Sequence, residues 1–128
     1  MNPTKPVPTD LELELLKVVW QRGQATVREV YQDLLKQRKI AYTTVLTMMG
    51  VLETKGHLRR FPGERAYVYR PAEPKRRVVE RMVNEFVKRV FNGSAKPLLV
   101  HLAEDPKISL DDFREIEKLL RARRKRES

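Results

Sequence analysis

Two helices are predicted near the start of the chain, each beginning at a capping box that precedes apolar residues at helical spacing. In the first box, the Thr9 hydroxyl can accept a hydrogen bond from the third helical N–H, and Glu12 can reach back to the backbone of Thr9. Thr26 and Glu29 repeat this spacing and predict a second helix over about 27–38. The apolar residues of both segments then fall on one side of each helix, which is typical of helices that share a core.

A third helix is predicted within "AYTTVLTMMGVLETKG", residues 41–56, and its outward face is unusual. The inward stripe has spacing i, i+3, i+4 and i+7 and consists of Val45, Met48, Met49 and Leu52. The outward positions are Thr43, Thr44, Leu46, Thr47, Gly50, Val51 and Thr54. No side chain that reads a base edge through two hydrogen bonds occurs there before Lys55. Gly50 costs ~1 kcal/mol relative to alanine in a helix interior, which a close approach of DNA or of another helix would justify.

After residue 56 the pattern changes from helical spacing to short strands. "HLRRF" (57–61) and "AYVYR" (66–70) are separated by "PGER", in which Pro62 and Gly63 suit the first two central positions of a turn. The resulting hairpin carries four cations, Arg59, Arg60, Arg65 and Arg70. Three helices followed by a basic hairpin are the element order of a winged helix-turn-helix, in which the third helix enters the major groove and the wing binds phosphates.

The prolines of "RPAEPK" (70–75) mark a boundary before a second, helical region. Its first helix, about 75–91, has apolar residues over roughly 220° of its circumference, against roughly 100° for a surface helix. A short helix in "KPLLVHLAE" and a last one from Ser109 to about Arg124 follow. Because three short helices bury too little surface to be stable alone, we predict a homodimer formed by this region. The predicted contact residues are Val79, Met82, Val83, Phe86, Val90, Leu98, Leu99, Leu102, Phe113, Ile116 and Leu120.

The fold class predicted is therefore mainly α with a small β-hairpin wing. Residues 1–8 are expected to form a flexible arm, 9–72 a winged-helix DNA-binding domain, and 73–128 a helical dimerisation domain with a basic C-terminal tail.

Composition favours a polyanionic partner and argues against several other classes. The formal net charge is +10 with a pI of about 10.1, which suits nucleic acid or an anionic membrane surface. The chain has no cysteine, and His57 and His101 stand apart from clustered carboxylates, so no metal site and no cofactor are expected. No catalytic motif occurs, which predicts that the protein is not an enzyme. Without a long apolar run or a signal peptide, we expect a soluble cytoplasmic protein with no membrane insertion.

Four stretches of the sequence resemble one family: "LELELLKVVW", "TVREVYQDL", "AYTTVLTMMGVLETKGHLRR" and "GERAYVYRP". They are similar to the penicillinase-repressor family of bacterial transcription factors, the BlaI/MecI group, from about Thr9 to Leu120. The resemblance implies a homodimer that binds a palindromic operator in double-stranded DNA and represses antibiotic-resistance or stress-response genes. The expected DNA-binding residues are Tyr42, Thr43, Thr44, Thr47, Lys55, Arg59, Arg60 and Arg65.

The resemblance also implies how repression is released and where this chain differs. In the best-known members a membrane-bound sensor protease leads to cleavage at an Asn-Phe bond, and the matching stretch "LLVHLAE" places His101 and Leu102 at that bond. Gly50 and Val51 stand where the family usually has polar or basic residues.

Two hypotheses from other classes compete with a repressor: a winged-helix adaptor that docks an acidic protein partner, and a shape-selective nucleoid or RNA-binding protein. A fragment of self-symmetric DNA from the protein's own promoter separates them, because the adaptor would not bind it and the nucleoid protein would bind every fragment.

Overall fold

The computed structural model describes residues 6–127 and divides them into two compact units, one up to Glu85 and one from Phe86 onward. Only the last three positions of the predicted arm over 1–8 are described, and Pro8 among them is buried. The rest of the arm lies outside the described residues.

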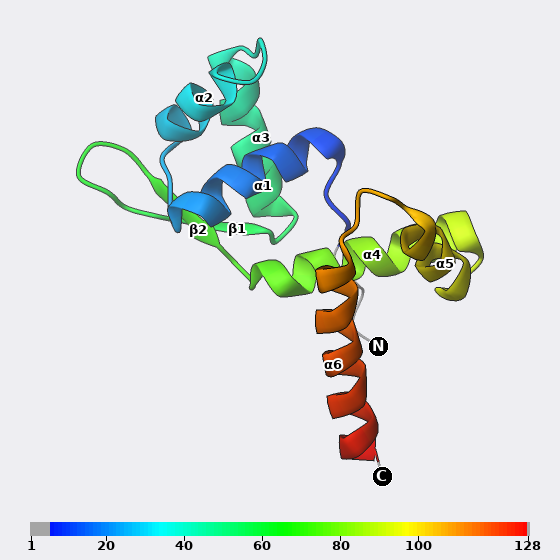
Figure 1. Ribbon diagram of the computed structural model, residues 1–128. Helices are drawn as coiled ribbons and strands as arrows, with labels where there is room; N and C mark the ends of the chain where they lie inside the picture. The colour runs from blue at the N-terminus through cyan, green and yellow to red at the C-terminus, as the bar shows by residue number, and fades with distance from the viewer. Residues whose placement is uncertain (1–5, 128) are drawn as a thin grey trace. The chain divides into compact units, whose positions relative to one another are not determined.

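The first unit contains three helices followed by a hairpin, as predicted. The elements are α1 (Asp10–Arg22), α2 (Val27–Leu35), α3 (Tyr42–Thr54), β1 (Leu58–Phe61), β2 (Val68–Pro71) and the beginning of α4 (Lys75–Phe91). Figure 1 shows α1, α2 and α3 gathered into one group with the hairpin extending from its edge. This arrangement confirms the predicted fold class, a mainly helical protein with a winged helix-turn-helix.

Both predicted capping boxes are present. The Thr9 side chain accepts from the Glu12 backbone and the Glu12 carboxylate accepts from the Thr9 backbone, at 3.3 and 2.8 Å. The Thr26 and Glu29 pair does the same at 3.1 and 2.9 Å. The predicted span of 27–38 was too long for α2, because the backbone N–H groups of residues 36–38 bond to Asp33 and Leu34 carbonyls in tight turns after Leu35.

The core of the first unit lies where α1, α2, α3 and β2 meet. Fourteen hydrophobic residues are buried: Leu15, Leu16, Val18, Val19, Ala25, Val27, Val30, Leu34, Val45, Met49, Leu52, Leu58, Tyr69 and Val78. The predicted α3 stripe is confirmed, with Met48 partly buried beside the three fully buried members. The core therefore fixes which side of α3 faces outward.

The hairpin is antiparallel with Phe61 opposite Val68 and Leu58 opposite Pro71. The predicted four-residue turn was wrong, since residues 62–67 form a six-residue loop between the strands. Tyr69 sets this register, because its buried ring anchors β2 while its backbone N–H and carbonyl bond to Ala25 at 2.8 and 3.0 Å. The wing is thereby tied to the connection between α1 and α2.

The start of α4 belongs to the first unit. Val78 is buried in its core and Met82 packs against it, so the compact unit extends past the proline-rich segment at which the boundary was predicted. Arg81 binds the half-buried Glu73 with both terminal nitrogens, and Nδ1 of the fully buried His57 lies 3.6 Å from Oε1 of Glu73. Burial lowers the pKa of His57 more than the nearby Glu73 carboxylate raises it.

The second unit contains the end of α4, α5 (Lys96–Glu104) and α6 (Leu110–Glu127). The Ser109 hydroxyl accepts from the Asp112 backbone at 3.1 Å and caps α6 as predicted, although the helix continues past the predicted end near Arg124. The basic run 121–126 is thus helical and exposed. Among the described residues from 86 to 127, none is buried.

Within residues 6–127, no helix has the length and apolar character needed to span a bilayer. The same described residues contain no cluster of three histidine, aspartate or glutamate side chains arranged to hold a metal ion.

Candidate nucleic-acid interface

The outward face of α3 is exposed at its threonines and at Leu46, and half-buried at Gly50 and Val51. Thr43, Thr44, Thr47 and Thr54 are exposed, while Val45, Met49 and Leu52 on the opposite side are fully buried. At ~100° per residue, positions 43, 47, 50 and 54 fall on one line along the helix, facing directly away from the buried stripe. The predicted threonine face is therefore presented to solvent, and its side chains offer only hydroxyl and methyl groups.

Gly50 lies at the middle of this line, and no neighbouring element of the described residues requires a glycine there for lack of space. Apart from its two chain neighbours and the nearby backbone of α3 itself, a Cβ placed there would have no atom of the described residues within 4 Å. A close approach by another helix of the described residues therefore does not explain this glycine.

Tyr42 begins α3 and is fixed by an edge-to-face contact with Tyr31 of α2, with ring centroids 5.4 Å apart. Its side chain remains exposed at 42%. Because α3 has no side-chain N-cap at Ala41, this aromatic contact helps to define where the helix starts.

Lys55, which was predicted to bind DNA, lies beside a buried carboxylate in this structure. Its Nζ lies 2.8 Å from a carboxylate oxygen of Glu12, which is 1% exposed. Burial raises the pKa of Glu12, but hydrogen bonds from Lys55 and Thr9 outweigh it and lower the pKa overall. Sequence gave no signal for this pair, because the two residues are 43 positions apart. Lys55 is thus occupied in neutralising a buried carboxylate.

The arginines of the wing differ in how many contacts they make with neighbouring side chains. Arg60 lies 3.5 Å from Glu53 and over the ring of Tyr67, and Arg70 donates to Gln24 and lies over the ring of Phe61. Arg59 stands directly opposite Arg70 in the ladder and is exposed. Two like charges across a hairpin are unfavourable on their own, so an anion bound beside them would be stabilising.

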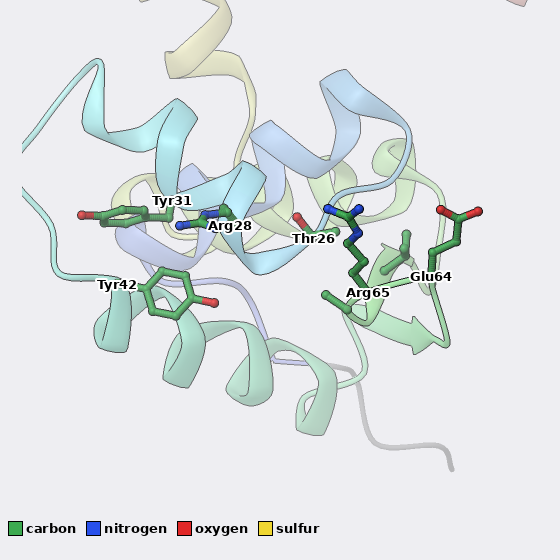
Figure 2. A pocket seen from close by; sticks show the side chains of 8 residues that line it. Thr26, Arg28, Tyr31, Tyr42, Glu64 and Arg65 are labelled. Carbon is green, nitrogen blue, oxygen red and sulfur yellow. The ribbon is translucent and has the colours of Figure 1, made fainter.

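A hollow of about 870 Å³ lies between α2, the start of α3 and the wing loop. Figure 2 shows Arg28 and Tyr31 on α2, Tyr42 on α3, and Arg65 on the loop around it. The remaining lining residues are Thr26, Glu64, Ala66 and Val68. Sequence reasoning identified Arg65 and Tyr42 but missed Arg28 and Tyr31. The sequence signal for Arg28 was its position in the first turn of α2, between Thr26 and Glu29 of the capping box. In a helix-turn-helix, the first helix crosses the DNA backbone.

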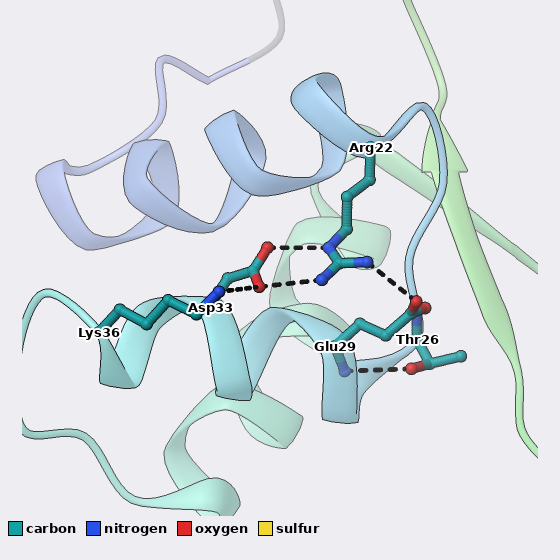
Figure 3. Close-up of polar contacts among 5 residues, drawn as sticks. All are labelled: Arg22, Thr26, Glu29, Asp33 and Lys36. Carbon is teal, nitrogen blue, oxygen red and sulfur yellow. Dashed lines mark hydrogen bonds and ion pairs between the residues drawn. The ribbon is translucent and has the colours of Figure 1, made fainter.

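Arg22 of α1 holds α2 near both of its ends. This guanidinium donates to both carboxylate oxygens of Asp33 at 2.8 and 2.9 Å, and to Glu29 at 3.0 Å (Figure 3). The hydrogen bonds from Arg22 lower the pKa of Asp33. Both acidic side chains of α2, Glu29 and Asp33, are thereby bound to Arg22 of α1.

The residues predicted for dimerisation are mostly exposed in both units. In the first unit Val79 and Val83 are exposed, whereas Met82 packs against the core. In the second unit the exposed residues are Phe86, Val90, Leu99, Leu102, Ile116 and Leu120, while Leu98 and Phe113 are half-buried. The predicted cleavage bond between His101 and Leu102 lies inside α5, where both residues are exposed.

The chain is similar to known repressors over most of its length. The sequence profile described as "Penicillinase repressor" matches residues 8–122. The penicillinase repressor of Bacillus licheniformis is 27% identical over 121 residues, covering 94% of each chain. The transcriptional regulator BlaI of Mycobacterium tuberculosis is 33% identical over 97 residues, covering 74% of this chain and 70% of that protein.

Among solved structures, the Bacillus licheniformis BlaI monomer in complex with the blaP half-operator is similar to this chain. It superposes with a TM-score of 0.50 at 32% identity, covering 56% of this chain and 88% of the other. The profile match and these relatives agree with the winged helix and the arrangement of α3 and the wing. The chain therefore belongs to the penicillinase repressor family.

Proposed function

We propose that this protein is a DNA-binding transcriptional repressor that acts as a homodimer on a palindromic operator and controls antibiotic-resistance or stress-response genes. The observation that carries the proposal is the exposed threonine face of α3 beside the exposed arginines of the wing. In a winged helix, these two surfaces meet the major groove and the adjacent phosphates. A repressor of this kind blocks transcription by occupying the promoter.

Arginines position the protein on the duplex. Arg59 and Arg65 are exposed and have no ion-pair partner among the described residues, so both can bind phosphates without first losing an internal contact. Arg60 must exchange its contact with Glu53, and Lys55 its contact with Glu12. Among the predicted cations, we therefore rank Arg59 and Arg65 above Arg60, and Arg60 above Lys55.

Sequence is read by small groups on α3. Thr43, Thr44 and Thr47 offer hydroxyls for phosphates or base edges and methyl groups for thymine, and Tyr42 offers a further hydroxyl. Gly50 lets the middle of the helix approach the bases more closely than any other residue would. Each contact is weaker than a two-bond arginine–guanine pair of ~1–3 kcal/mol, so DNA shape contributes to selection.

The exposed apolar residues of the second unit support a homodimer. A second copy provides the same exposed stripe, and two winged helices held by a twofold axis place their α3 helices about one turn of duplex, ~34–36 Å, apart. The BlaI relative whose complex was solved as a monomer binds a half-operator. We propose that two copies of this chain bind two such half-sites.

Release of repression by a sensor protease stays a prediction for this chain. The bond between His101 and Leu102 lies within a helix, and a protease acts on extended backbone, so α5 must unwind before cleavage. With nine residues and none of them buried, α5 is a helix of low local stability.

The test is a binding assay with a self-symmetric fragment from the protein's own promoter, compared with random duplex, over a range of salt concentrations. The wild type should prefer the symmetric fragment. Arg65→Ala should weaken binding to both fragments and reduce the salt slope by ~1. Thr47→Ala should instead reduce the preference for the symmetric fragment while leaving the salt slope unchanged.

Lys17→Ala is the matched control, because Lys17 is exposed on the outward side of α1, away from α3. It should leave both the slope and the preference unchanged. Equal binding of the wild type to the symmetric and random fragments would contradict a sequence-specific repressor, and no binding to either would contradict DNA binding.

A further inference from the structure

The hollow between α2 and the wing loop is lined by two arginines from elements far apart in sequence. Arg28 comes from the first turn of α2 and Arg65 from the loop between β1 and β2, and Tyr31 and Tyr42 also line the hollow (Figure 2). Glu64 is the acidic residue in the lining, and it lies at the end of the hollow away from the two tyrosines.

These two arginines differ from four other arginines of the first unit, which are paired with acidic side chains. Arg22, Arg38, Arg60 and Arg81 each lie within 4 Å of a carboxylate, at Asp33, Glu14, Glu53 and Glu73. Arg28 and Arg65 are exposed, and neither has a hydrogen-bond or ion-pair partner among the described residues. The lining therefore holds two arginines against one acidic side chain, Glu64, and carries a net positive charge.

The position of Arg28 adds a second source of positive potential. Its helix begins at Thr26, where the partial positive charge of the α2 dipole is concentrated. The capping box satisfies two of the backbone N–H groups there but leaves this dipole in place. A phosphate near Arg28 would meet a guanidinium and a helix N-terminus together.

We infer that this hollow holds one short segment of the DNA sugar–phosphate backbone, with Arg28 binding it from α2 and Arg65 from the wing. The inference rests on the proposed function and adds to it a positioning residue outside α3 and the wing. A volume of about 870 Å³ is larger than one phosphate needs and suits a few linked groups. Binding one backbone segment from both sides fixes the depth at which α3 enters the groove, because α2, α3 and the wing share one core.

The experiment combines substitutions in the full-length protein with duplexes in which single phosphates are replaced by uncharged methylphosphonates. For the wild type, neutralising one or two adjacent phosphates should weaken binding most. Arg28→Ala should weaken binding to operator and random duplex alike, reduce the salt slope by ~1, and abolish the effect of that neutralisation. Arg65→Ala should become insensitive to the same or the neighbouring phosphate.

Arg38→Ala is the matched control, because Arg38 follows the other end of α2 and is held by Glu14 at 2.7 Å. It should keep the wild-type response to every neutralised phosphate. Arg28→Lys should retain most of the salt slope, since it keeps the charge. Thermal unfolding of each variant checks that the exposed substitution leaves the fold intact.

An Arg28→Ala variant with the wild-type salt slope, in a protein whose Arg65→Ala variant does lose slope, would overturn the inference and leave the proposed function standing. Sensitivity of the two variants to phosphates on distant parts of the duplex would also overturn it. If the wild type binds no duplex at all, the proposed function itself fails.

Discussion

The two compact units of this protein use their hydrophobic residues in opposite ways. Residues up to Glu85 contain all fourteen buried hydrophobic residues, with Leu15, Val19 and Leu52 completely enclosed. Of the described residues from Phe86 onward none is buried, and Leu110 and Leu119 are 73% and 69% exposed. One chain thus combines a unit that completes its own core with a unit that does not.

This contrast is the reason for assigning the proposed homodimer contact to one surface and the proposed DNA contact to another. Exposed apolar stripes of this extent are typical of surfaces that pack against another protein, which is the reason for proposing a homodimer through the second unit. The exposed face of α3 has the opposite character, with hydroxyls, a glycine and neighbouring cations, and it suits a polar and anionic partner.

The largest effect is expected from damaging the core of the first unit. Leu52→Ala removes a completely buried side chain from α3 and should lower the free energy of unfolding by about 2–5 kcal/mol. Thermal or chemical unfolding of the full chain measures this. Leu46→Ala on the outward side of the same helix, 49% exposed, is the control and should cost far less. Equal losses would contradict the assigned orientation of α3.

A charge placed on the exposed apolar surface of the second unit should weaken the proposed dimer. Ile116→Asp places a charge on an exposed apolar side of α6 and should shift the protein from dimer to monomer by at least tenfold in dissociation constant, because burying an unpaired carboxylate is costly. Analytical ultracentrifugation over a concentration series measures the shift. Lys118→Asp, on the other side of α6, should leave the dimer intact. A wild type that stays monomeric at micromolar concentration would contradict the proposed interface.

Gly50→Ala should separate stability from binding within α3. Beyond the backbone of α3 itself, the added methyl meets no atom within 4 Å among residues 6–127, so the protein should become more stable by ~1 kcal/mol through helix propensity. We expect operator affinity to fall nonetheless, while binding to random duplex stays nearly unchanged. Unfolding and binding titrations on the same preparation test both parts. A variant that gains stability and keeps full operator affinity would show that Gly50 does not approach the bases.

The smallest effect concerns pH and the buried His57, which faces Glu73 and Arg81 with Glu12 also nearby. Because burial lowers the pKa of His57 in the folded state, the unfolded chain binds the proton more readily. Stability should be greatest above the ordinary histidine pKa of about 6.5 and should fall as pH drops below it. His57→Gln should flatten this part of the stability profile, and His101→Gln, at an exposed position, should preserve it.

The sequence patterns predicted correctly those features that depend on residues close together in the chain. The boxes at Thr9 and Thr26 and the cap at Ser109 are confirmed, because a helix start depends on residues three positions apart. The α3 stripe is confirmed because one side of that helix must be buried. The wing loop was predicted too short, because the strand register depends on where Tyr69 meets Ala25, far away in sequence.

The candidate site was predicted only in part for the same reason. The outward position of the α3 threonines follows from helical spacing. The pairing of Lys55 with Glu12, and the placement of Arg28 near Arg65 in one hollow, depend instead on how α1, α2, α3 and the wing pack together. Which cations remain available to DNA is a property of the folded unit, since it is decided by carboxylates that the fold brings near.

The most direct test of the account is the mass of the complex that the full chain forms with a self-symmetric operator duplex, measured by native mass spectrometry beside a duplex containing one half-site. We expect two chains on the symmetric duplex at saturation, bound together even when protein is limiting. A single chain per symmetric duplex at saturation would contradict the claim that the exposed stripes of the second unit pair two winged helices on one operator.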